Sequence, residues 1–180
     1  MNSKTMTKSR TSTPTLSEIV LAVDPGFDRI GLAIMKLERD RPKLLFSECL
    51  KTDSKKTRPE RLFSIGRRAK EVIKKWRPET LAIETIFFNT NTTSAIGVAE
   101  ARGIIIYEAI RARMKIFEYG PQTIKIAVTG YGKADKIQMA NMVKKLVSLP
   151  QKTSKRLDDE VDAIALGITH LVSRRGTKSG

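Results

Sequence analysis

The chain has 180 residues, which is enough for one domain with a full hydrophobic core but few for two. Its 34 Lys and Arg against 19 Asp and Glu give a formal net charge of +15, which favours a polyanionic partner through phosphate contacts. A single cysteine and a single histidine exclude an internal disulfide and a structural zinc site, since such a site needs about four Cys or His ligands.

Residues 1–17 are rich in Ser and Thr, carry several Lys and Arg, and contain no acid. Such a segment buries too little apolar surface to offset its chain entropy, so we expect a disordered basic arm there. The arm lacks the apolar region of a signal peptide, and no apolar run approaches the roughly 18 residues that span a bilayer. We therefore expect a cytoplasmic protein with no membrane partner, a folded domain over residues 18–174 and a flexible tail over 175–180.

Three strands are predicted at the start of the folded domain. The apolar run IVLAV ends at Asp24-Pro25-Gly26, a sequence typical of a turn, and predicts a buried strand. The segments RIGLAIMKL and KLLFSECL follow, separated by the polar residues 38–43. Three neighbouring strands at this spacing indicate an antiparallel meander.

The remainder of the chain alternates helices with strands. Pro59 suits the first turn of an amphipathic helix, and Arg77-Pro78 ends that helix. The segment TLAIETIFF predicts a buried strand that carries Glu84. Further elements are predicted as a helix over about 93–113, a strand over 115–118, helices over 121–128 and 133–147, and a last helix over 158–172. The element order is that of the RNase H-like fold, an α/β architecture with a five-stranded mixed sheet flanked by helices.

Four acids stand out from the solvated ones. Asp24 and Glu84 each follow apolar residues at the point where a strand leaves the sheet, and a buried carboxylate is costly unless it is paired or bound to metal. Asp159 and Asp162 lie three residues apart on the last helix and project from one face. Asp24 and Glu84 could instead be salt-bridged or turn-forming acids, and an acid at a helix N-terminus, Asp158 above all, suits a cap. Asp162 lies one turn further in and is harder to explain by capping.

Together these carboxylates predict an all-oxygen site for hard divalent cations, which means Mg²⁺ with Mn²⁺ as a substitute. Two such ions about 3.5–4 Å apart can hydrolyse a phosphodiester, one activating water and the other stabilising the leaving oxygen. The sequence offers no G-x-S-x-G, Cys–His pair or Walker lysine motif as another route.

The ordered motifs LAVDPG, AIETIFF, VAEARG, FEYGPQTIK, TGYGKADK and LDDEVDAIALGITH resemble the successive blocks of the bacterial RuvC family, the crossover junction endodeoxyribonucleases. The resemblance runs from about Ile19 to His170, and the final D-x-x-D-A block is its most specific part. DPGFDRIG departs from the pattern at Phe27 and Asp28, where familiar members have smaller or basic residues.

The resemblance implies that Asp24, Glu84, Asp159 and Asp162 bind two Mg²⁺ per subunit, although the double acid leaves Asp158 open as the third ligand. It implies a homodimer that resolves four-way Holliday junctions in DNA recombination and repair by symmetric cuts with 5′-phosphate ends, with RuvA and RuvB as branch-migration partners. Phe87 is implied to stack on unpaired bases, and Lys125 and Lys136 to lie near the scissile phosphate.

Several expectations keep an alternative. Lys133 is expected to contact phosphate together with Lys125 and Lys136, although exposed lysines are usually only solvated. The helix around VAEARGIIIYEAI could pack on the sheet, form a dimer interface, or do both. His170 lies near a helix C-terminus, where a cation is favoured, and is assigned no catalytic role. Tyr131 could pack or touch a sugar.

Competing functions are an RNase H-like or YqgF-type nuclease that cuts hybrids or RNA, a nucleic-acid binding protein without activity, and an actin-like ATPase. A pure phosphate binder gains nothing from clustered negative charge, which disfavours the second. The third would need phosphate-binding glycine loops that the sequence lacks.

Overall fold

The computed structural model describes residues 18–86, 92–149 and 158–176. The predicted basic arm over 1–17 and the predicted stacking residue Phe87 lie outside these ranges. None of the helices in the described ranges is both long and apolar enough to cross a bilayer.

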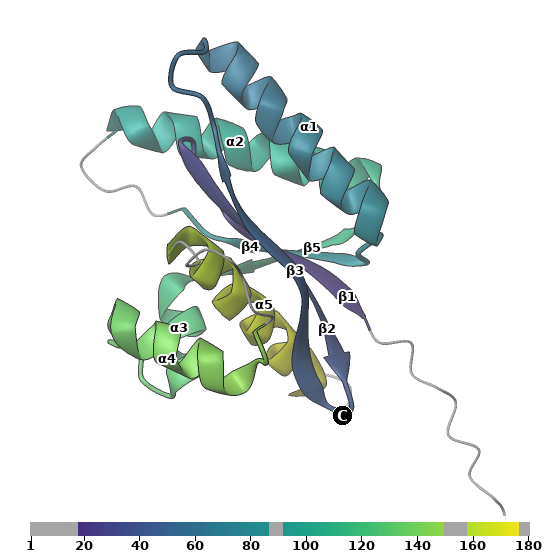
Figure 1. Cartoon of the computed structure of the whole chain (residues 1–180), viewed down its shortest axis with the longest axis vertical. Helices are drawn as coiled ribbons and strands as arrows, with labels where there is room; N and C mark the ends of the chain where they lie inside the picture. Colours follow the sequence, from purple (N-terminus) through teal and green to yellow (C-terminus); the bar gives the residue numbers. More distant parts are fainter. Residues whose placement is uncertain (1–17, 87–91, 150–157, 177–180) are drawn as a thin grey trace, which may run out of the picture.

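The described chain forms one mixed sheet between two layers of helices (Figure 1). The sheet has five strands in the order β3-β2-β1-β4-β5, in which β1 pairs with β2 antiparallel and with β4 parallel. The expected five-stranded mixed sheet flanked by helices is confirmed. The strands are β1 (Ile19–Asp24), β2 (Arg29–Glu38), β3 (Arg41–Lys51), β4 (Thr80–Glu84) and β5 (Lys115–Tyr119).

Helices cover both faces of the sheet. One layer holds α1 (Arg58–Trp76) and α2 (Thr92–Arg111), and the other holds α3 (Pro121–Thr129), α4 (Lys136–Leu146) and α5 (Asp158–Gly176) (Figure 1). Helix α5 packs directly on β1 and β2. It extends to Gly176, two residues into the segment predicted as a tail.

Strand β1 shows why the core has two halves. Side chains alternate across a strand, so Leu21 and Val23 pack with α1 and α2, whereas Val20 and Ala22 pack with α3, α4 and α5. All four side chains are fully buried. A strand with both faces buried needs a continuous apolar run, which is what IVLAV supplies.

The β2–β3 hairpin is tighter than the sequence indicated. The polar residues 38–43 suggested a longer turn, but only Arg39 and Asp40 connect the strands. Both have left-handed backbone angles, with φ of 48° and 63°. Two consecutive positive φ values are typical of a two-residue type I′ turn, whose twist matches that of the flanking strands.

The helix boundaries also refine the prediction. The helix expected over 133–147 begins only at Lys136, because Asp135 caps it by accepting a hydrogen bond from the backbone N–H of Gln138 at 2.8 Å. The Gln138 side chain in turn accepts from the Asp135 N–H at 3.0 Å, which completes a capping box.

Candidate active site

Asp24 and Glu84 lie at the carboxyl ends of neighbouring parallel strands. Val23 pairs with Ile83 across β1 and β4, so Asp24 and Glu84 occupy the next position on each strand. Neighbouring strands are about 4.8 Å apart, and the alternation of side chains turns both carboxylates towards the layer that holds α5. The sheet alone therefore brings together two residues that are 60 positions apart.

Helix α5 begins over the same end of the sheet. The carbonyl of Asp159 sits so close to Gly31 that a Cβ at position 31 would collide with it, and Gly31 is the β2 partner of Asp24. The absence of a side chain at Gly31 is what lets the first turn of α5 approach the end of β1. Asp159 and Asp162 are thereby placed beside Asp24.

The first turn of α5 is held from β2 and β3. Arg29 Nε lies 3.3 Å from Asp159 Oδ2, and the Cys49 thiol contacts the same oxygen at 3.8 Å. Ser47 Oγ donates a 2.5 Å hydrogen bond to the buried carboxylate of Glu160. These long-range contacts were not predicted from the sequence, since nothing local connects a strand residue to an acid over 100 positions away.

Glu84 and Asp162 face a cavity of about 430 Å³. Two cations, Lys125 from α3 and Lys136 from α4, line the same space. The other lining residues are Pro121, Ile124, Ala134, Asp135 and Met139. The cavity thus combines carboxylates with lysines, as a site for both a divalent cation and a phosphate requires.

The carboxylates repel one another. Burial, followed by the charges of Glu84, Asp162 and Asp159, raises the pKa of Asp24 to about 8. Burial and then Asp162 raise the pKa of Glu84. Burial raises the pKa of Asp162 too, although Lys136 opposes this rise. The raised values mark negative charge that the protein itself does not neutralise.

A divalent cation fits the chemistry of this donor set, because it would neutralise charge that burial and mutual repulsion disfavour. Within the described ranges, no three Cys, His, Asp or Glu side chains are already packed as a metal site. The register of β1 and β4, and the charges of neighbouring acids that raise the pKa values of Asp24, Glu84 and Asp162, nevertheless identify one acidic cluster.

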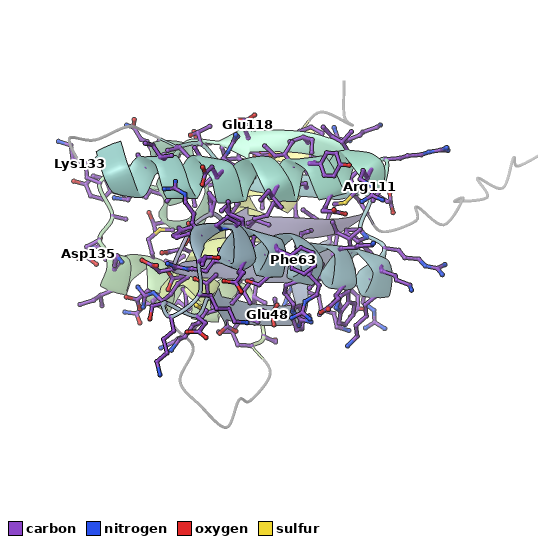
Figure 2. The ribbon with its side chains drawn as sticks, turned by 90° about the horizontal axis from the view of Figure 1, so that it is seen from above. Glu48, Phe63, Arg111, Glu118, Lys133 and Asp135 are labelled. Atoms are coloured by element: carbon purple, nitrogen blue, oxygen red, sulfur yellow. The ribbon has the colours of Figure 1, made fainter. Side chains whose placement is uncertain are left out.

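The lysines predicted to meet phosphate divide into two groups. Lys125 and Lys136 line the cavity, and Lys136 Nζ also lies 3.8 Å from Asp158 Oδ2 at the surface. Lys133 is exposed and lies outside the cavity lining. Figure 2 places Lys133 and Asp135 at the end of the molecule opposite Arg111. Tyr131 is exposed as well, which leaves its ring available to a partner.

The expectation for His170 was wrong in one respect. His170 is fully buried rather than placed as a cation at a helix end, and burial lowers its pKa. Its Nδ1 lies 2.9 Å from the Tyr119 hydroxyl, and its Nε2 lies 3.1 Å from Thr80 Oγ1 and 3.3 Å from Glu18 Oε1. The side chain therefore joins α5 to the sheet in its neutral form.

Comparison with known proteins gives a consistent result. The family described as crossover junction endodeoxyribonuclease RuvC matches residues 20–170. A relative of that name from Alkaliphilus metalliredigens is 41% identical over 152 residues, which cover 84% of this chain and 92% of that protein. Another, from Rubrobacter xylanophilus, is 37% identical over 158 residues, which cover 88% of this chain and 87% of that protein.

The fold is similar to a solved structure of the same kind. T. thermophilus RuvC in complex with a Holliday junction substrate superimposes with a TM-score of 0.81 and 32% sequence identity. The match covers 89% of this chain and 97% of that one. The sequence motifs and the fold thus lead independently to one group of proteins.

Proposed function

Because the chain belongs to the RuvC family of crossover junction endodeoxyribonucleases, we propose that it resolves Holliday junctions by metal-dependent hydrolysis at the cluster of Asp24, Glu84, Asp159 and Asp162. The junction complex of the T. thermophilus relative supports the four-way substrate. The observation that carries the site assignment is the shared register of β1 and β4, which sets Asp24 beside Glu84 under the first turn of α5.

The four carboxylates would hold two Mg²⁺ ions. When bound, such ions supply an activated water and neutralise the negative charge that develops on the departing oxygen. The carboxylates are acceptor-only when ionised, so their part is to bind and orient. Asp159 is favoured over Asp158 as the third ligand because Asp159 is half-buried and raises the pKa of both Asp24 and Asp162. Asp158 also acts on Asp162, but it is exposed and lies near Lys136.

Lys125 and Lys136 would bind the scissile phosphate. Both line the cavity that Glu84 and Asp162 face, so a phosphate that approaches the acids meets two ammonium groups on the way. Such contacts position a nucleic-acid backbone without reading its sequence. Lys133 would contact the backbone further out, and the stacking role of Phe87 stays a prediction.

The protein would act as a homodimer through α2. Ile96, Tyr107 and Ile110 are each more than half exposed on that helix. Gly103 lies between them on the helix, and a Cβ added there would meet no atom within 4 Å. Ile96, Gly103, Tyr107 and Ile110 follow one another at intervals of seven, four and three residues, which places them along one face of α2. Phe63, 72% exposed, projects from the neighbouring α1 (Figure 2). An apolar stripe of this kind suits burial against a second copy, and a dimer would present two sites to a symmetric junction.

The remaining predictions concern the context of the enzyme. RuvA and RuvB as branch-migration partners, a cytoplasmic location, and the division into an arm, a nuclease domain and a short tail follow from the family resemblance and the sequence. They stay proposals.

A labelled mobile four-way junction tests the function directly. With Mg²⁺ we expect paired nicks that ligase can seal, and we expect no product in EDTA. Asp24→Asn should lower the cleavage rate by more than about 100-fold, because loss of a group that only orients a metal ligand already costs about 10–100-fold. Junction binding by this variant should be retained.

Asp53→Asn, at an exposed acid in the loop after β3, is the matched control and should cut like the wild type. An RNA–DNA hybrid assayed in parallel separates a junction resolvase from a hybrid nuclease. Cleavage by Asp24→Asn at the wild-type rate would refute the site assignment. Preferential cutting of the hybrid would refute the proposed substrate.

A further inference from the structure

The loop that follows Asp24 is held by an arginine from α1. The Arg61 guanidinium lies 3.9 Å from the centroid of the Phe27 ring, and it forms an ion pair with Asp28. Its Nη2 and Nε donate to Thr52 Oγ1 at 2.6 Å and 3.0 Å. Thr52 Oγ1 in turn donates to the Phe27 carbonyl at 2.9 Å, and the Thr52 backbone N–H donates to the Asp28 carbonyl at 3.0 Å.

The Phe27 ring also packs against the first turns of α2. A Cβ at Gly97 would lie 3.0 Å from Phe27 Cγ, so a larger residue there would require the ring to shift by a few tenths of an ångström. Arg58 approaches the same ring at 5.6 Å and pairs with Glu100 of α2 at 2.7 Å. The ring therefore connects the loop after β1 with both helices of one layer.

These contacts join the segments that leave the two acidic strands. Phe27 comes three residues after Asp24, across Pro25, whose ring fixes the backbone φ angle. Helix α2 follows β4, which ends at Glu84. Because only Pro25 and Gly26 separate Phe27 from Asp24, the contacts of the Phe27 ring with α2 restrict where the end of β1 can lie.

We propose that Phe27 and Arg61 form a positioning clamp that sets the affinity of the acidic cluster for divalent cations. The proposal rests on the proposed function, since it assigns the clamp to the same metal site. Neither residue touches the reacting atoms; both act through Asp24.

The contacts of Arg61 favour this role over direct binding of DNA. Only 12% of its side chain is exposed, and its guanidinium is already engaged by Thr52, Asp28 and the Phe27 ring. An arginine that binds phosphate presents free donors to solvent. Arg67 on the same helix is exposed, so its substitution by Gln removes the same charge without touching the Phe27 loop and serves as a control.

The test measures Mn²⁺ binding by calorimetry on the full chain, for wild type, Arg61→Gln, Phe27→Leu and the control Arg67→Gln. We expect the Mn²⁺ affinity to fall about 10-fold in Arg61→Gln and Phe27→Leu, as for residues that orient metal ligands. It should stay unchanged in Arg67→Gln. Single-turnover cleavage should fall in parallel at low Mg²⁺ and recover at high Mg²⁺, while junction affinity in EDTA matches that of Arg67→Gln.

Two outcomes would overturn the clamp. One is unchanged Mn²⁺ affinity in folded Phe27→Leu, which keeps the test open even where Arg61→Gln fails to fold. The other is a loss of junction affinity in Arg61→Gln well beyond that of Arg67→Gln with Mn²⁺ binding intact, which would make Arg61 a DNA contact. A wild type that binds Mn²⁺ but cuts no junction would refute the proposed function and leave the clamp standing.

Discussion

The two ends of β1 hold two clusters of buried polar groups that have opposite electrostatics. Before the strand begins, Glu18 joins His170, Thr80 and Tyr119 in a set of mutual hydrogen bonds. Burial alone would raise the pKa of Glu18, but the hydrogen bond with His170, together with the charge of Arg174, lowers it. Where the strand ends, Asp24 faces other carboxylates, and its pKa is raised to about 8.

This difference in electrostatics indicates that one end of β1 stabilises the fold and the other binds a ligand. Polar groups that satisfy one another hold α5 on the sheet and contribute to stability. Carboxylates that repel one another cost stability and are retained where a ligand supplies the missing charge. Three predictions test this contrast, and they are ordered by the size of the expected change in the free energy of unfolding.

The largest change is expected at the satisfied end. His170→Ala should lower the free energy of unfolding by about 3 kcal/mol, because it opens a cavity and leaves buried hydroxyl and carboxylate partners without their hydrogen bonds. Denaturant melts would measure it. Val172→Ala, on the exposed side of the same helix, should cost less than about 0.5 kcal/mol. Equal losses in the two variants would mean that the His170 cluster contributes no stability.

A smaller change of opposite sign is expected at the acidic end. Asp24→Asn should raise the free energy of unfolding in EDTA by about 1 kcal/mol at pH 8, because it removes a carboxylate whose charged form is disfavoured by burial and by the neighbouring acids. A gain of this size raises the melting temperature by about 2–4 °C. Addition of Mn²⁺ should stabilise the wild type more than the variant. A destabilised Asp24→Asn protein in EDTA would show that Asp24 is a structural residue.

The smallest effect is the pH dependence of that gain. The folded pKa of Asp24 lies above its unfolded value, so the folded chain binds more protons across the window from about 4 to about 8. The stability of the wild type in EDTA should therefore lose this contribution as pH rises through the window. The advantage of Asp24→Asn should therefore be smallest at pH 4, already be present at pH 5 and grow towards pH 8.

His170 contributes a slope of the opposite sign. Its folded pKa is lowered, so the stability that it provides is complete above its unfolded value near 6.5 and is lost as pH falls below that value. Melts at pH 5 and pH 8 on both variants separate the two slopes. An Asp24→Asn advantage that is largest at pH 5 would contradict the account.

Local patterns were enough to predict the acidic strand ends. Asp24 and Glu84 could be singled out because each follows a fully apolar run at the point where a strand ends. Asp162 was recognisable because capping accounts for acids only in the first turn of a helix. These predictions needed only strand periodicity and chain order.

The parts that were missed depend on contacts between distant segments. The ion pair of Arg29 and the hydrogen bond of Cys49 with Asp159 join residues more than 100 positions apart. The Phe27–Arg61 contact joins a loop to a helix. The burial of His170 depends on how β5 lies beside α5, which its position near a helix end did not reveal. The late start of α4 was readable, since Asp135 and Gln138 have the spacing of a capping box.

The most direct test is a crystal structure of the protein soaked in Mn²⁺, with anomalous scattering used to locate the ions. Two peaks about 3.5–4 Å apart are expected, bound by Asp24, Glu84, Asp159 and Asp162. Asp158 should remain outside the ligand set. Peaks bound elsewhere, or no ordered ion at the ends of β1 and β4 in a soaked crystal, would contradict the assignment of the metal site.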